Sequence, residues 1–195
     1  MVAIAPRSES AHAVSPNADS LDAFVADIEA LCRVHHDDRA LADAVAERLA
    51  RLVRDPDWLP ARHRVPADEG YCPHLVHVAP DGRWSLVSLV WKPGQRTPIH
   101  DHVSWCVVGV HRGEEYETTY RLAGEEAAPY LIATAQTVNP IGSVVALVPP
   151  GDIHRVKNSC DGVAVSIHVY GADVSALGSS ILRRYDLAVR PGLPA

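Results

Sequence analysis

Three histidines in two short windows of the sequence have the types and spacing of a metal site. His100 and His102 stand at i and i+2 in the stretch GQRTPIHDH, and His154 follows the turn residues PPGD. Successive side chains on a β-strand alternate between its faces, so His100 and His102 would point to the same side. Neutral imidazole suits iron, zinc, copper or nickel, so the ligand type alone does not choose the metal. Because the chain has 11 histidines, a surface or core role is the alternative for any one of them.

A second row of polar residues lies in the segment GVAVSIHVYG. Ser166, His168 and Tyr170 are spaced two residues apart, so on a strand they would share one face. A buried row of this kind needs hydrogen-bond partners, since an unpaired buried polar group costs free energy. The alternative is a polar face exposed to solvent. The position of the segment directly after the His154 window favours the interior of a barrel.

The elements that position these residues begin with a helical part. Residues 1–19 are rich in Ala, Ser and Pro, which predicts a disordered tail. Residues 20–55 carry two helical patterns, with Ser20 as the expected N-cap of the first helix. Asp55-Pro56 would end the second helix, because proline does not continue one.

The rest of the chain has the character of a β-protein. Over residues 70–172, short Val-rich runs alternate with turn signals such as Asp81-Gly82, which predicts antiparallel strands. No helical pattern separates these runs, so the fold class is an all-β sandwich or barrel. A final helix is expected near residues 174–187. The sequence therefore predicts one domain over residues 20–195, with a short N-terminal helical cap.

Composition excludes several classes of function. A net charge of −6 gives no electrostatic case for nucleic-acid binding, and the apolar runs are shorter than the ~20 residues of a membrane helix. The N-terminus has no apolar run of signal-peptide length. The cysteines form no CxxC pair, which favours a reducing compartment and the cytoplasm. They are Cys32, Cys72, Cys106 and Cys160. We expect a monomer or a small homo-oligomer.

The histidine windows resemble the two motifs of the cupin superfamily. The first motif is G, five residues, HxH, three or four residues, E, six residues, G. Its positions are matched by Gly94, His100, His102 and Gly113, with Cys106 in place of the Glu. The second motif is G, five residues, PxG, two residues, H, three residues, N. It is matched, with one extra residue after the first Gly, by Gly142, Pro149, Gly151, His154 and Asn158. The resemblance implies a metal site in a jelly-roll-like antiparallel β-barrel.

Within the cupins, the chain resembles the thiol dioxygenases, the family of cysteine dioxygenase and 3-mercaptopropionate dioxygenase. The resemblance covers residues 70–172 and the short N-terminal helices. It implies a mononuclear Fe(II) site and no organic cofactor, with a small thiol and dioxygen as partners and a sulfinate as product. The iron ligands implied by the resemblance are His100, His102 and His154.

The Ser-x-His-x-Tyr relay of that family is present as Ser166, His168 and Tyr170. By resemblance, Tyr170 offers its hydroxyl to the oxygen or the substrate, His168 orients Tyr170, and Ser166 orients His168. Cys106 falls where mammalian-type cysteine dioxygenases carry the cysteine that forms a thioether with the active-site tyrosine. The resemblance therefore predicts that Cys106 lies beside Tyr170, as a thioether partner or as a small buried residue.

The chain departs from the family where the substrate carboxylate binds. An Arg or Gln usually stands two residues after a Tyr, but here Tyr71 is followed at that spacing by Pro73, which has no side-chain donor. We expect Tyr71 and His74 to contact the substrate, with His77 or an Arg elsewhere as alternatives. The thiol is therefore left open, and oxidation beyond a sulfinate in a specialised pathway is an alternative.

Two other classes of function remain at this point. One is a metal cupin that acts on a substrate other than a thiol, and the other is a non-catalytic cupin that senses a metal or a thiol. The relay favours the dioxygenase, because a binding module has no evident need for it.

Overall fold

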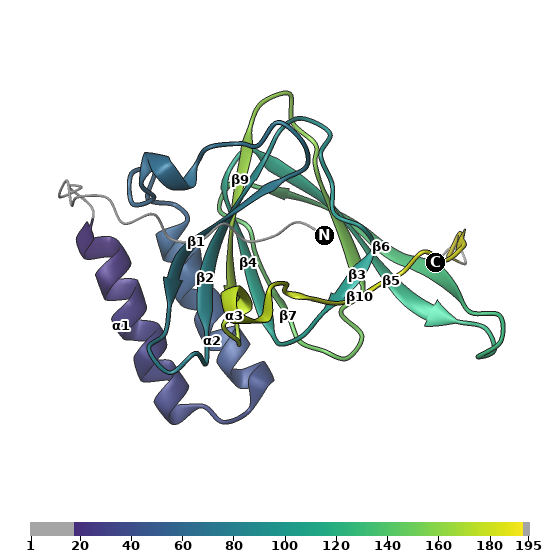
Figure 1. The fold of residues 1–195 in the computed structure, drawn as a ribbon, viewed down its shortest axis with the longest axis horizontal. Coiled ribbons are helices and arrows are strands. Elements are labelled where there is room, and N and C mark those ends of the chain that lie inside the picture. The colour runs from purple at the N-terminus through teal and green to yellow at the C-terminus, as the bar shows by residue number, and fades with distance from the viewer. Residues whose placement is uncertain (1–17, 193–195) are drawn as a thin grey trace.

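The computed structural model describes residues 18–192 of the chain, which form two helices followed by two β-sheets (Figure 1). The predicted tail lies outside the described residues as far as residue 17. Helix α1 (Ala18–Val34) begins three residues before Leu21, the first helical residue expected after the Ser20 N-cap. Ser20 therefore lies inside the helix, and its hydroxyl donates to Asp55 at 3.1 Å, which ties α1 to the segment after the second helix.

Helix α2 (Asp38–Leu52) begins where the carboxylate of Asp37 accepts a hydrogen bond from the backbone N–H of Ala40 at 2.8 Å. Apolar residues at helical spacing on both helices are buried and form one core with the neighbouring sheet. Gly109 allows the close approach of α2, because a Cβ there would lie 2.9 Å from Val53 and 3.1 Å from Leu49. The predicted helical cap therefore covers one face of the sheet.

The strands form two sheets that curl towards each other into a half-barrel. The five-stranded sheet, in spatial order, consists of β1 (Cys72–Val78), β2 (Ser85–Trp91), β9 (Ala164–Tyr170), β4 (Cys106–Arg112) and β7 (Val144–Leu147). The six-stranded sheet, in spatial order, consists of β10 (Ile181–Arg184), β3 (His100–His102), β8 (His154–Asn158), β5 (Glu114–Ala123), β6 (Tyr130–Pro140) and β11 (Val189–Arg190). Only the β6–β11 pair is parallel among the described strands. The predicted all-β barrel-like fold with a helical cap is confirmed.

The two faces of strand β9 lie in different environments, one in the apolar core and one inside the barrel. Val165, Ile167 and Val169 are fully buried in the core shared with the helices. The alternate residues face the second sheet, where hydrogen bonds join Ser166 to His168 and His168 to Tyr170. Period-2 alternation thus places an apolar row on one face and a polar row inside the barrel.

The prediction of a C-terminal helix over residues 174–187 was wrong beyond its first turn. Helix α3 (Val174–Leu177) ends at Gly178, whose φ of 74° is the left-handed conformation that stops a helix. The chain then enters β10 and pairs with β3. Among the described helices, none has the length and apolar character that a membrane span requires.

Candidate metal centre and pocket

The three predicted metal ligands come together on two neighbouring strands of the six-stranded sheet. His100 on β3 is the register partner of His154 on β8, and His102 lies two residues further along β3. All three side chains are buried, and one ring nitrogen of each lies within 4.8 Å of the others. Three converging imidazoles at this spacing can hold one metal ion.

Two of these histidines are oriented by buried carboxylates. The Nδ1 of His102 lies 2.8 Å from an oxygen of Asp152, and the Nδ1 of His154 lies 2.6 Å from an oxygen of Glu117. Since an ionised carboxylate only accepts hydrogen bonds, each Nδ1 must carry the hydrogen. The Nε2 lone pair of each ring is then available to a metal, an arrangement typical of histidine metal ligands.

His100 completes the set with a backbone partner. Its Nδ1 lies 3.0 Å from the carbonyl oxygen of Pro98, which also only accepts. Burial, together with the neighbouring imidazole of His154, lowers the pKa of His100 well below its ordinary value. The Nε2 of His154 is buried and has no hydrogen-bond partner among the described residues. A metal ion would account for this atom, so the donor set fits a metal site.

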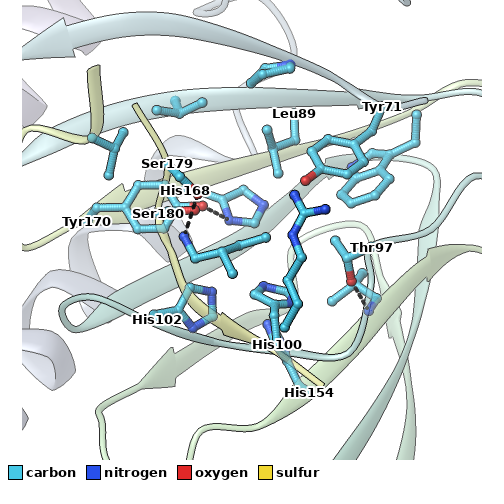
Figure 2. A pocket seen from close by; sticks show the side chains of 17 residues that line it. Tyr71, Leu89, Thr97, His100, His102, His154, His168, Tyr170, Ser179 and Ser180 are labelled. Atoms are coloured by element: carbon cyan, nitrogen blue, oxygen red, sulfur yellow. Dashed lines mark hydrogen bonds between the residues drawn. The ribbon is translucent and has the colours of Figure 1, made fainter. Parts of the chain in front are cut away.

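The relay residues lie on β9 of the facing sheet, and Figure 2 shows two of them, His168 and Tyr170, beside the metal ligands. The hydroxyl of Tyr170 is 3.1 Å from the Nδ1 of His168, and the Nε2 of His168 is 2.9 Å from the hydroxyl of Ser166. The indole N–H of Trp91 donates to the same Ser166 oxygen at 3.1 Å. The ring centroids of Tyr170 and His102 are 6.2 Å apart, so the relay ends beside the metal ligands.

Burial sets the protonation of the relay. It lowers the pKa of His168 to about 3, with the neighbouring His102 and His154 acting in the same direction. It also raises the pKa of Tyr170 well above its ordinary value. The imidazole of His168 is therefore neutral at physiological pH, and the phenol of Tyr170 keeps its hydrogen.

Cys106 lies next to the relay. It is the register partner of Tyr170 across β4 and β9, and its Sγ is 3.9 Å from the Nδ1 of His168. Burial raises the pKa of this thiol well above its ordinary value. The predicted proximity of Cys106 and Tyr170 is thus present, whereas the thioether stays a prediction.

The two predicted substrate residues differ in their position. Tyr71 lines the pocket together with Pro73, and its ring centroid is 4.7 Å from that of Trp91. His74 is outside the pocket lining, and its Nε2 lies 2.7 Å from the carbonyl oxygen of Val65. The assignment of His74 as a substrate ligand stays a prediction, without support from the pocket lining. Because side chains alternate along β1, a strand that turns Tyr71 and Pro73 inward turns His74 outward.

Arg184 also lines the pocket, although the sequence analysis did not single it out. It lies on β10 opposite His100, and its charge acts to lower the pKa of Tyr71, which burial raises. The adjacent Arg183 pairs with Asp101 at 2.7 Å, whereas no ion pair of Arg184 is present among the described residues. The pocket therefore has an unpaired cation near its tyrosine.

Two acidic residues on β5 were also missed. Glu117 is the carboxylate behind His154, and Glu115 is 1% exposed, with burial raising its pKa to about 7. The signal was their i, i+2 spacing, which turns both side chains to the interior of the barrel.

Comparison with known families identifies the chain. A family model described as "Cysteine dioxygenase type I" matches residues 10–180, which is most of the sequence. The chain belongs to the cysteine dioxygenase type I family. The three histidines and the relay of this family member thus occupy the interior of its barrel.

Several solved structures are similar to this family member over part of its length. The TT1209 protein from Thermus thermophilus is 20% identical, with 57% of this chain and 91% of that chain covered and a TM-score of 0.42. An RmlC-like cupin from Desulfovibrio desulfuricans is 22% identical, with 57% and 92% covered and a TM-score of 0.42. A double-stranded β-helix protein from Klebsiella pneumoniae is 18% identical, with 57% and 80% covered and a TM-score of 0.44.

Proposed function

We propose that the protein is a mononuclear non-haem iron thiol dioxygenase that converts a small thiol to its sulfinate. The observation that carries the proposal is the position of the relay. The hydroxyl of Tyr170, backed by His168 and Ser166, lines the same pocket as the three histidines. The family match supports the same chemistry.

His100, His102 and His154 would hold the ion through their Nε2 atoms. When bound, a ferrous ion supplies a redox centre for dioxygen and a positive charge that lowers the pKa of a thiol. Three neutral ligands leave the full charge of the dication, and buried Cys106 in place of a carboxylate adds none. This donor set favours an anionic sulfur ligand.

The protein residues then position the substrate and handle its proton. Tyr170 Oη lies at the pocket wall with its hydrogen retained, so it can donate to, or exchange a proton with, a group in the pocket. His168 holds Tyr170 through Nδ1, and Ser166 and Trp91 hold the rest of the network. The surrounding Val87 and Leu89 exclude water from the sulfur.

The other end of the substrate would meet Arg184 and Tyr71. Both line the pocket, and Arg184 can form a bidentate pair with a carboxylate. We therefore propose a small thiol with an acidic group, such as cysteine or a mercapto acid. Arg184→Ala should raise KM for such a thiol about 10-fold while kcat changes less, because a hydrogen bond to a charged group contributes about 1.5–3 kcal/mol. An equal rise in KM for acidic and neutral thiols would show that Arg184 does not bind the acidic group of the substrate.

The experiment that tests the proposed function is oxygen consumption by the iron-loaded protein over a panel of small thiols. The panel contains cysteine, 3-mercaptopropionate and a neutral thiol of similar size. Thiol-dependent uptake, fastest with an acidic thiol, is expected. Full iron occupancy without uptake for any thiol would overturn the proposal and favour a sensing cupin.

The thioether between Cys106 and Tyr170 is a second part of the proposal. It would form one carbon–sulfur bond as the thiol S–H and one ring C–H bond break, and dioxygen would take up the two electrons and two protons as hydrogen peroxide. Peptide mapping after turnover with a thiol would detect the joined peptides. Peptides holding Cys106 and Tyr170 that always run separately would rule the bond out.

A further inference from the structure

The strand that brings Arg184 to the pocket contains a β-bulge. Strand β10 pairs with β3 at the edge of the six-stranded sheet (Figure 1). The register partners are Ile181 and His102, Arg183 and Asp101, and Arg184 and His100. Between the first two pairs, β10 has one residue more than β3, and this extra residue is Leu182. Its side chain is exposed, so the bulge lies on the surface of the protein.

The bulge determines which of two adjacent arginines faces the pocket. Side chains alternate along a regular strand, so a regular β10 with Ile181 in the pocket would turn Arg183 inward and Arg184 outward. The structure has the opposite arrangement. Ile181 and Arg184 line the pocket, whereas Arg183 does not. The extra residue, Leu182, therefore exchanges the positions of the two arginines.

Asp101 binds the outward arginine on the other face of β3. It stands between His100 and His102, so its side chain points away from theirs, and it is 5% exposed. Its carboxylate accepts hydrogen bonds from the backbone N–H of Arg183 at 2.8 Å and from the Nε of the same residue at 2.9 Å. The hydroxyl of Tyr185 donates to this carboxylate at 2.8 Å. One buried carboxylate thus holds both the main chain and the side chain directly after the bulge.

These contacts distinguish two registers that the side chains of β10 alone would not. Arg183 and Arg184 are chemically identical, so a pocket that accepts one also accepts the other. In the regular register, Leu182 would lie opposite Asp101, and the buried carboxylate would lose its guanidinium partner. Loss of one partner of a buried ion pair is strongly destabilising, and bonds between charged groups are the stronger ones. The carboxylate of Asp101 therefore stabilises the bulged register.

We propose that Asp101, through the bulge at Leu182, selects Arg184 as the residue that binds the acidic group of the substrate. This inference rests on the proposed function, in which Arg184 meets that group. Asp101 does not line the pocket, so it is a positioning residue that acts through Arg183 and the backbone of β10. Its role is selectivity for an acidic thiol, and the metal ligands and the relay do not depend on it.

The first test is a double-mutant cycle on ligand binding by the full-length, zinc-loaded protein. Calorimetry measures the affinities for 3-mercaptopropionate and for the neutral thiol 2-mercaptoethanol, and the zinc content of each variant is measured in parallel. Asp101→Asn should weaken binding of 3-mercaptopropionate by up to about 10-fold, the effect of losing the Arg184 contact, and leave 2-mercaptoethanol unchanged. In an Arg184→Ala background, Asp101→Asn should change neither affinity, because no contact is left to position.

Asp43→Asn is the matched control, because it breaks an exposed pair with Arg39 on α2 and should keep both affinities. Equal weakening of the two probes in Asp101→Asn would show a merely structural role and overturn the proposal. Unchanged affinity for 3-mercaptopropionate, or the same loss in the Arg184→Ala background, would also overturn it. Binding needs no turnover, so the expected pattern in a protein that oxidises no thiol would count against the proposed function alone.

The second test removes the bulge. Without Leu182, regular alternation alone turns Arg183 towards Asp101 and Arg184 towards the pocket. The deletion of Leu182 should therefore retain the affinity for 3-mercaptopropionate. Asp101→Asn in this deletion variant should also retain it, because the register no longer depends on the carboxylate. A loss as large as in the chain with Leu182 would contradict the role of the bulge, and the double-mutant cycle decides alone if the deletion variant does not fold.

Discussion

The two sheets each present histidines to one pocket, but they hold these histidines by different kinds of partner. On the six-stranded sheet, the Nδ1 atoms of His100, His102 and His154 meet a carbonyl oxygen or a carboxylate, which only accept. On β9, His168 lies between two hydroxyl groups, which both donate and accept. The first arrangement fixes the tautomer, and the second leaves it to be set from outside.

This difference matches what each sheet has to do. A metal ligand needs its Nε2 lone pair at all times, so an acceptor behind each ring is an advantage. A residue that passes protons has to exchange its two nitrogens, so partners with a single movable hydrogen are required. Under the proposed function, histidine serves both purposes in one barrel because its neighbours, and not its own chemistry, select the role.

The largest effect is expected from removal of one of the three histidines on the six-stranded sheet. His154→Ala should lose iron and oxidation together, because two imidazoles cannot replace the third. Iron content by mass spectrometry and oxygen uptake would measure both. His36→Ala, an exposed histidine on the loop after α1, is the control. Stoichiometric iron in His154→Ala would show that the third ligand lies elsewhere.

A smaller effect is expected from a change in the relay on β9. Tyr170→Phe should retain iron and oxidise thiols about 100-fold more slowly, since a positioned acid–base group typically contributes 10²–10⁴-fold. Iron content and kcat, measured on the same preparation, distinguish loss of the metal from slower oxidation. An unchanged rate would make Tyr170 a structural residue.

The carboxylates behind the ligands should affect affinity for the metal. Glu117→Gln removes the charged acceptor from His154 and should weaken iron binding about 10- to 100-fold, as is typical for such partners. Competition with a chelator measures the affinity, with the exposed Glu47→Gln as control. Equal iron affinities of Glu117→Gln and the wild type would mean that the carboxylate of Glu117 does not fix the ring of His154.

The smallest effect concerns stability. Because the pKa of Glu115 is about 7 when folded and 4.5 ordinarily, the native state binds more protons than the unfolded state between these values. The free energy of unfolding of the wild type should therefore fall with rising pH relative to Glu115→Gln, by about 2.5 kcal/mol between pH 5 and 8. Denaturant unfolding at several pH values measures this, with Glu114→Gln as control. A constant difference would place the pKa of Glu115 outside this range.

Strand alternation explains why much of the site could be predicted. Period-2 spacing is sufficient to place His100 and His102 on one face and Ser166, His168 and Tyr170 on another. Each set lies within a single strand, so no long-range information is needed. The same rule, applied to Tyr71, would have turned His74 away from the pocket.

The parts that could not be predicted depend on pairing between distant segments. Arg184 reaches the pocket because β10 joins β3, and the Arg183 amide bonds to Asp101 across 82 positions of sequence. The local pattern of residues 174–187 is compatible with a helix, and only the free edge of β3 selects a strand. Glu117 contacts His154 because β5 pairs with β8, and no local spacing reveals this contact.

The measurement that tests the central claim most directly is oxidation of a thiol under ¹⁸O₂ by the iron-loaded protein. The proposed dioxygenase should give a sulfinate in which both oxygen atoms carry the label, in step with thiol-dependent oxygen uptake. Mass spectrometry of the product reads this out. A disulfide, an unlabelled product or a product with a single labelled oxygen would contradict the assignment.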